Sequence, residues 1–333
     1  MRVLFVLLMF ASFAWADAYS DGVAATDRSD YQEAIKQYTQ AIKENPNNAK
    51  AYYGRGLSYA KLSDYTKAIE DFTQAIKIDP NYTEAYWQRG VSYVGLYNHK
   101  KAIEDYARVI ELDPNNVEAY RNRSYWCNRL GDHSGAIENY TQWIKIDPNN
   151  AELYRKRGEL YQKLGDRSGA IEDFTQAIKI DPNNASAYAL RGKSYQNISD
   201  HSNAIADYTQ AIKLNPNNAE LYKKRDYSYY RLDDYSGAIE NYTQWIKIDP
   251  NNAEPYRKRG ELYQKLGEYS NAIADFTQAI KFDPNNVMAY NNRGVSYVRL
   301  GNHSKAIEDA RKACDLGNCY FLERLKKNNL IRN

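Results

Sequence analysis

Residues that carry chemistry are scarce in this sequence, which has four His and three Cys among its 333 residues. It contains no Gly-rich phosphate loop, no Cys-x-x-Cys pair and no Gly-x-Ser-x-Gly nucleophile motif. An enzyme needs reactive groups that converge. We therefore predict no catalytic residue, no cofactor and no metal site, and expect that the protein is not an enzyme.

The sequence also lacks an excess of either charge. Lys and Arg number 45 against 42 Asp and Glu, so no long-range field favours a polyanion. We expect no nucleic acid partner.

Long apolar runs are absent except at the N-terminus, where Arg2 precedes the run from Val3 to Phe13 and then Ala14-Trp15-Ala16. This pattern is typical of a signal peptide, here residues 1–16, with cleavage before Asp17. The alternative is an uncleaved anchor, but the run is shorter than the roughly 20 residues of a membrane-spanning helix. We expect an exported protein, periplasmic or secreted, whose mature chain has no membrane span.

The three cysteines suit an oxidising compartment, in which a disulfide persists. Cys314 and Cys319 flank a Gly317-Asn318 turn and are candidates for such a bond, although spacing alone does not guarantee the required geometry. The alternative is a pair of core thiols. Cys127 stands in a slot that is Tyr in other repeats and is predicted to be a small core residue.

Eight of the nine prolines recur at a strict spacing of 34 residues. Each is followed by Asn, so each marks a turn that ends one helix and supplies a capping side chain for the next. The series is Pro46, Pro80, Pro114, Pro148, Pro182, Pro216, Pro250 and Pro284.

Two helices are predicted between successive prolines. Tyr52, Gly56 and Tyr59 form one apolar stripe at helical spacing, and Ala68 and Phe72 belong to a second. A single helix pair cannot bury its own apolar face, so neighbouring pairs must stack.

The pattern Tyr-x-x-Arg-Gly-x-x-Tyr, Ala-x-x-x-Phe/Tyr and a closing Pro resembles the tetratricopeptide repeat (TPR) over residues 17–316. The resemblance implies an all-α fold, an α-solenoid of tandem helix-turn-helix repeats in a right-handed superhelix, with an inner groove formed mostly by first helices. It also implies a protein-interaction scaffold. The predicted parts are a degenerate repeat at 17–48, eight repeats at 49–82, 83–116, 117–150, 151–184, 185–218, 219–252, 253–286 and 287–316, and a capping helix within 317–333.

Arg precedes the Gly position in every complete repeat, where the family often has an apolar residue. A buried guanidinium needs a partner, and the second helix usually offers an Asp. We therefore predict a structural ion pair within each such repeat, as between Arg191 and Asp207.

Two repeats depart together from this pattern. Ser124 and Asp226 replace the Gly, and the Asp slot holds Asn139 or Asn241. Trp143 and Trp245 replace a small residue in the second helix of the same repeats, and residues 133–184 recur almost unchanged at 235–286, which indicates an internal duplication. We interpret the Trp residues as local repacking of the core.

The histidines occupy one slot of the repeat, where other repeats have Tyr. Slots separated by whole repeats lie on different levels of the stack, so these side chains cannot form a metal site or a catalytic triad. The residues concerned are His99, His133, His201 and His303.

Function is predicted at the variable first-helix positions, which are rich in basic and aromatic residues. We predict a groove that binds an extended, carboxylate-rich protein or peptide segment. Glu159 and Glu261 also lie on this predicted groove face and are acidic. The alternatives are a solvated face and a binding module for anionic carbohydrate or another polyanion. The proposed role is a scaffold within an envelope or secretion assembly. Trp87 and Val91 replace the residues of the family's carboxylate clamp, so that activity is not inferred. The candidates are Tyr53, Trp87, Arg121, Tyr125, Arg129, Arg155, Lys163, Lys193, Lys223, Tyr227, Tyr230, Arg231, Arg257, Lys265 and Arg299.

Overall fold

The computed structural model describes residues 18–328, and within this range the regular structure is helical throughout. The predicted signal peptide, residues 1–16, lies outside the described residues, as do residues 329–333 of the predicted cap. A helix at 18–27 lies within the predicted degenerate repeat, ahead of the complete repeats. The first helices of the complete repeats are α3 (Ala49–Lys61), α5 (Thr83–Gly95), α7 (Val117–Arg129), α9 (Ala151–Leu164), α11 (Ala185–Asn197), α13 (Ala219–Arg231), α15 (Ala253–Lys265) and α17 (Val287–Arg299).

A second helix follows each first helix, and a shorter helix ends the described chain. The second helices are α2 (Tyr31–Glu44), α4 (Tyr65–Ile78), α6 (His99–Leu112), α8 (His133–Ile146), α10 (Arg167–Ile180), α12 (His201–Leu214), α14 (Tyr235–Ile248), α16 (Tyr269–Phe282) and α18 (His303–Asp315), and the last helix is α19 (Tyr320–Lys327). No described helix combines the length and the apolar character that a bilayer crossing requires.

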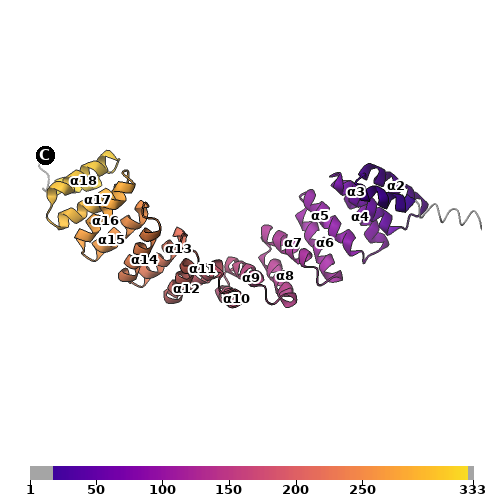
Figure 1. The fold of residues 1–333 in the computed structure, drawn as a ribbon, viewed down its shortest axis with the longest axis horizontal. Coiled ribbons are helices and arrows are strands. Elements are labelled where there is room, and N and C mark those ends of the chain that lie inside the picture. Colours follow the sequence, from indigo (N-terminus) through magenta and orange to yellow (C-terminus); the bar gives the residue numbers. More distant parts are fainter. Residues whose placement is uncertain (1–17, 329–333) are drawn as a thin grey trace, which may run out of the picture. The chain divides into compact units, whose positions relative to one another are not determined.

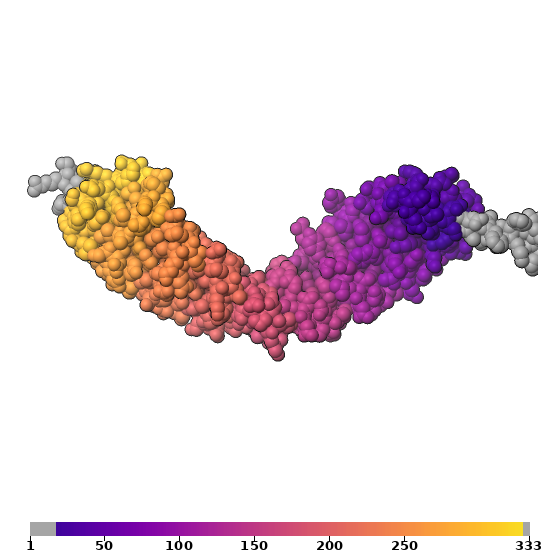
Figure 2. All heavy atoms as spheres, viewed as in Figure 1, coloured from indigo at the N-terminus to yellow at the C-terminus, as the bar shows by residue number. Residues whose placement is uncertain are grey.

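The chain divides into two compact units, Met1–Leu164 (unit 1) and Gly165–Asn333 (unit 2). Within each unit the helices stack in chain order (Figure 1), and the surface colours of each unit change steadily along the chain, so segments distant in sequence do not mix (Figure 2). Contact only between successive repeats is the defining property of a solenoid. The predicted all-α solenoid is confirmed.

Local signals set the helix boundaries. Oδ1 of Asn48 accepts from the backbone N–H of Ala51 at the start of α3, and Asp64 caps α4 in the same way. The turn inside a repeat requires a positive φ, which Gly131 adopts at 82° and Ser63 at 63°. These caps and turns explain why each repeat holds a helix pair of nearly constant length.

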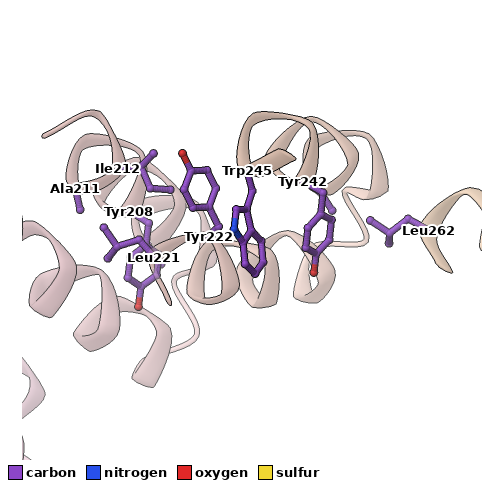
Figure 3. Packing of buried hydrophobic residues seen from close by; sticks show 10 residues of the cluster. Tyr208, Ala211, Ile212, Leu221, Tyr222, Tyr242, Trp245 and Leu262 are labelled. Carbon is purple, nitrogen blue, oxygen red and sulfur yellow. The ribbon is translucent and has the colours of Figure 1, made fainter. Parts of the chain in front are cut away.

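The core lies between successive helices, where small and aromatic residues alternate. Ala68 and Phe72 are fully buried, and Gly56 allows the close approach, since a Cβ there would lie 2.8 Å from the Phe72 ring. In the duplicated repeats Trp245 lies between the rings of Tyr222 and Tyr242, with centroids 6.0 and 6.1 Å away (Figure 3). Trp245 is buried, which confirms the interpretation of core repacking.

A guanidinium links the two helices of a repeat to the preceding repeat. Arg191 of α11 donates from Nε and Nη2 to the two carboxylate oxygens of Asp207 on α12, at 2.8 and 2.7 Å. Its Nη1 donates to Oγ1 of Thr175 on α10, 3.0 Å away. Burial raises the pKa of Asp207, and the hydrogen bonds from Arg191 offset part of that rise. The predicted pair is confirmed, whereas the bond to Thr175 was not predicted.

The same three-way contact recurs along both units. Arg157 and Asp173 belong to different units, so their pairing stays a prediction. The other complete sets are Arg55 with Asp71 and Thr39, Arg89 with Asp105 and Thr73, Arg259 with Asp275 and Thr243, and Arg293 with Asp309 and Thr277.

The C-terminal end of unit 2 is covered by α19. Phe321 and Leu325 of this helix are buried against Ala310, and a disulfide joins Cys314 to Cys319 with their Cα atoms 4.0 Å apart. Cys127 is free and buried, and burial raises the pKa of its thiol.

Replacement of Arg191 by Met should destabilise unit 2 by about 3 kcal/mol, because it leaves the buried Asp207 carboxylate without its partner. The double variant Arg191→Met, Asp207→Leu should recover part of that loss, since it removes both charges. Urea unfolding followed by circular dichroism measures the difference, with Lys193→Met, an exposed change on the same helix, as control. Equal unfolding midpoints for Arg191→Met and the control would refute the structural role.

Reduction of the Cys314–Cys319 disulfide should loosen α19 selectively. A bond that closes so short a loop contributes about 2 kcal/mol in the chain-entropy model, so amide hydrogen exchange in residues 320–327 should become faster with reductant. Amides of α12 should be unaffected. The variant Cys314→Ser, Cys319→Ser serves as the control, because its exchange should not respond to reductant; unchanged exchange of α19 in the natural chain contradicts the expectation.

Candidate functional site

The predicted binding residues stand at the fifth, ninth, twelfth and thirteenth positions of the first helices, as Lys223, Tyr227, Tyr230 and Arg231 do on α13. Spacings of three and four residues place such positions on one side of a helix. We call this side the first-helix face and describe it separately in each unit.

In unit 1 the face begins with aromatic residues that are partly buried. Tyr53 packs on Phe72, with centroids 5.8 Å apart, and on Tyr82 at 5.0 Å. Trp87 packs on Tyr106 at 5.3 Å. These predicted contact residues therefore have a supporting layer that fixes their rings.

The middle of unit 1 is more polar. Arg121, Tyr125 and Arg129 are exposed on α7, and Nη1 of Arg121 lies 2.6 Å from Oε1 of Glu118 on the same helix. Nζ of Lys163 donates to Oδ1 of Asn128 at 2.9 Å, which links α9 to α7.

Two predicted cations are engaged by carboxylates of their own helices. The Arg155 side chain is only 15% exposed and is paired with Glu152 and Glu159. In the duplicated segment, Arg257 is 13% exposed and paired with Glu261. These pairs neutralise the guanidinium groups, so they are poor candidates for binding a partner's carboxylate.

In unit 2 the face carries exposed aromatic and basic side chains. Tyr227 and Tyr230 are 51% and 53% exposed, and Lys193 and Arg231 are also exposed. Nζ of Lys265 lies 4.6 Å from the ring centroid of Tyr230, within the range of a cation–π contact.

Side-chain contacts join successive first helices of unit 2 into a continuous surface. Nε2 of Gln196 on α11 donates to the carbonyl of Lys224 on α13 at 2.7 Å. Nζ of Lys223 lies 2.9 Å from Oε2 of Glu254 on α15. Gln264 of α15 donates to the carbonyl of Asn292 on α17 at 3.0 Å.

Each unit also has a cavity on this face. A cavity of about 510 Å³ in unit 1, which we call the α3–α5–α7 cavity, is lined by aromatic and acidic side chains: Tyr53, Glu84, Trp87, Asp113, Asn116 and Glu118 are among them. In unit 2, a cavity of about 410 Å³ between α17 and α19 includes Arg299, Arg324, Val298 and Phe321. Sequence reasoning missed the acidic residues of the first cavity, although Glu recurs at the second position of many first helices.

The histidines lie apart at the starts of second helices. Nδ1 of His99, of His133 and of His201 is buried without a hydrogen-bond partner. Among residues 18–328, no three His, Cys, Asp or Glu side chains are grouped so that they could hold a metal ion.

Family models match most of the chain. Models described as "Tetratricopeptide repeat" match residues 20–83, 83–116, 185–218 and 289–316. A model described as "TPR repeat" matches 127–165, 163–199, 227–267 and 265–301. The chain belongs to the tetratricopeptide repeat family.

Solved structures similar to this TPR protein include that of Naa15/Naa10 bound to HypK-THB, with a TM-score of 0.59 at 14% identity over 95% of this chain and 66% of that chain. This likeness supports the TPR solenoid fold. MamA is 26% identical over 55% of this chain and 97% of its own, with a TM-score of 0.44. YrrB, described as a TPR protein with an unusual peptide-binding site, is 22% identical over 58% of this chain and 100% of its own, with a TM-score of 0.47. No curated protein matches this chain.

Proposed function

We propose that this TPR protein is a non-catalytic interaction scaffold that binds an extended, carboxylate-rich segment of a partner protein on the first-helix face of unit 2. The observation that carries the proposal is a set of exposed cations that form no ion pair with described residues, on the same face as exposed tyrosine rings. Lys193 and Arg231 are such cations, and Tyr227 and Tyr230 are the rings.

The contrast with neutralised cations of the same face supports this assignment. Lys223 pairs with Glu254 and Arg257 with Glu261, so their charges are already balanced. Arg231 keeps a free guanidinium fork, which can donate two hydrogen bonds to one carboxylate. Tyrosine adds apolar area at a small cost in side-chain entropy, as is common at interaction hot spots.

We further propose that the protein is exported and that its partner belongs to an envelope or secretion assembly. The support is the N-terminal pattern of Arg2, an apolar run and Ala14-Trp15-Ala16, together with the interaction role common among repeat scaffolds. An anionic carbohydrate is the second candidate ligand, because exposed Tyr227 and Tyr230 beside Arg231 also suit a sugar chain.

The test is binding of the mature chain to an array of peptides graded in net charge, with an anionic polysaccharide as competitor. Acidic peptides that contain apolar residues should bind best, and Lys193→Ala with Arg231→Ala should weaken that binding by about tenfold, or about 1.4 kcal/mol. The salt dependence of binding should also become weaker, because fewer charges are engaged.

The matched control is Lys179→Ala with Lys213→Ala, which removes the same charge from exposed positions of the second helices α10 and α12. An equal loss of peptide affinity in both double variants would show that only the net charge matters, and it would contradict the proposed binding site. Tighter binding of the polysaccharide than of every peptide would favour the carbohydrate alternative.

A further inference from the structure

The α3–α5–α7 cavity of unit 1 has a lining of opposite charge to the binding surface of unit 2. Carboxylates of Glu84, Asp113 and Glu118 line it together with the rings of Tyr53 and Trp87. No Lys or Arg is among its lining residues. Its volume of about 510 Å³ falls within the range of small-ligand sites.

Two other repeats of the chain show how equivalent carboxylates are neutralised. Glu254, at the second position of α15, is paired with Lys223 from the fifth position of the preceding first helix, at 2.9 Å. Glu152 of α9 is paired with Arg155 from the fifth position of its own helix, with Nε 2.8 Å from Oε2. In these two repeats a cation at a fifth position neutralises the acidic second position.

At the cavity the fifth positions of α3 and α5 are aromatic, whereas that of α7 is Arg121. Tyr53 stands where Lys223 stands relative to the next acidic residue, here Glu84, and Trp87 has the same relation to Glu118. Glu84 is exposed and forms no ion pair with described residues, whereas Glu118 is paired with Arg121, both more than half exposed. Burial, and next to it the charge of Glu84, raises the pKa of Tyr53. Glu84 therefore lacks the fifth-position cation that Glu152 and Glu254 have, whereas Glu118 has Arg121 of its own helix, and neither a Lys nor an Arg lines the cavity.

We propose that this cavity binds a lysine or arginine side chain of a partner polypeptide, which takes the place that a side chain of the protein itself fills in other repeats. The cationic group contacts the faces of Trp87 and Tyr53, pairs with Glu84, and shares the carboxylate of Glu118 with Arg121. The helix dipole favours Glu in the first turn of a helix, and this effect is enough to explain the acidic residues. It does not explain two consecutive aromatic replacements around a cavity. The site is independent of the acidic-segment surface of unit 2.

The experiment is an NMR titration of the full mature chain with three capped tripeptides, Gly-Lys-Gly, Gly-Arg-Gly and Gly-norleucine-Gly. The indole N–H signal of Trp87 is assigned by its loss in Trp87→Phe. The lysine and arginine peptides should shift this signal with dissociation constants of the order of millimolar, and Trp143 and Trp245 should not respond. Norleucine, which has a similar length without the charge, should have little effect.

Glu84→Gln with Glu118→Gln should weaken binding at least about fivefold, which corresponds to about 1 kcal/mol. Glu220→Gln, at the same repeat position in unit 2, is the matched control, and circular dichroism checks the fold of each variant. For the unmodified chain, added salt should weaken binding of the cationic peptides. No Trp87 response to either cationic peptide, an equal response to norleucine, or unchanged affinity in the folded double variant would each overturn the proposal. These outcomes do not depend on whether acidic peptides bind unit 2, so the two proposals can fail separately.

Discussion

The stack depends on the guanidinium of the recurring Arg, because its donors need acceptors from two other helices and so link three helices together. Arg191 reaches Asp207 in its own repeat and Thr175 in the preceding one. Apolar contact between Ala and aromatic side chains drives burial but has little directional preference. A half-buried ion that needs hydrogen bonds at fixed angles is directional. The Arg contacts therefore help to set the register of a repeat on its neighbour wherever the neighbour supplies the Thr.

This structural use of one cation leaves function to the positions at which charge is not balanced within the chain. Arg155 and Lys223 form ion pairs with carboxylates of the same chain, so the surface of the repeat is locally neutral there. A free Arg231 makes the face basic in unit 2, and Trp87 in a cation's place leaves an acidic cavity in unit 1. Changes at single positions of a common repeat can thus produce surfaces of opposite sign without altering the helices that hold them.

Much of the fold was predictable because its determinants are local. Pro80 and its equivalents end helices by steric exclusion and Asp64 caps the next one, so the period was sufficient to place the helix pairs. The Arg–Asp pairs followed from the cost of burying an unpaired charge. The contact with Thr175 did not, because that hydroxyl also donates to the carbonyl of Ile171, a bond common to many helical Thr residues. The candidate site was less predictable, since the partners of Arg155 depend on its rotamer and the α3–α5–α7 cavity depends on residues from three helices.

The internal duplication shows that the hydrogen bonds of the recurring Arg depend on the neighbouring repeat as well as on its own. Arg123 and Arg225 precede almost identical second helices, and both face Asn instead of Asp. Arg225 has three partners, because Thr209 of the preceding repeat accepts from Nη1 at 2.9 Å while Asn241 and Gln244 accept from the other nitrogens. The preceding repeat of Arg123 offers Ala107 at that position, and Nε of Arg123 is buried without a partner. The guanidinium that faces the duplicated second helix therefore has an acceptor for each nitrogen in one context and an unpartnered Nε in the other, and Thr209 in place of Ala107 supplies one of those acceptors.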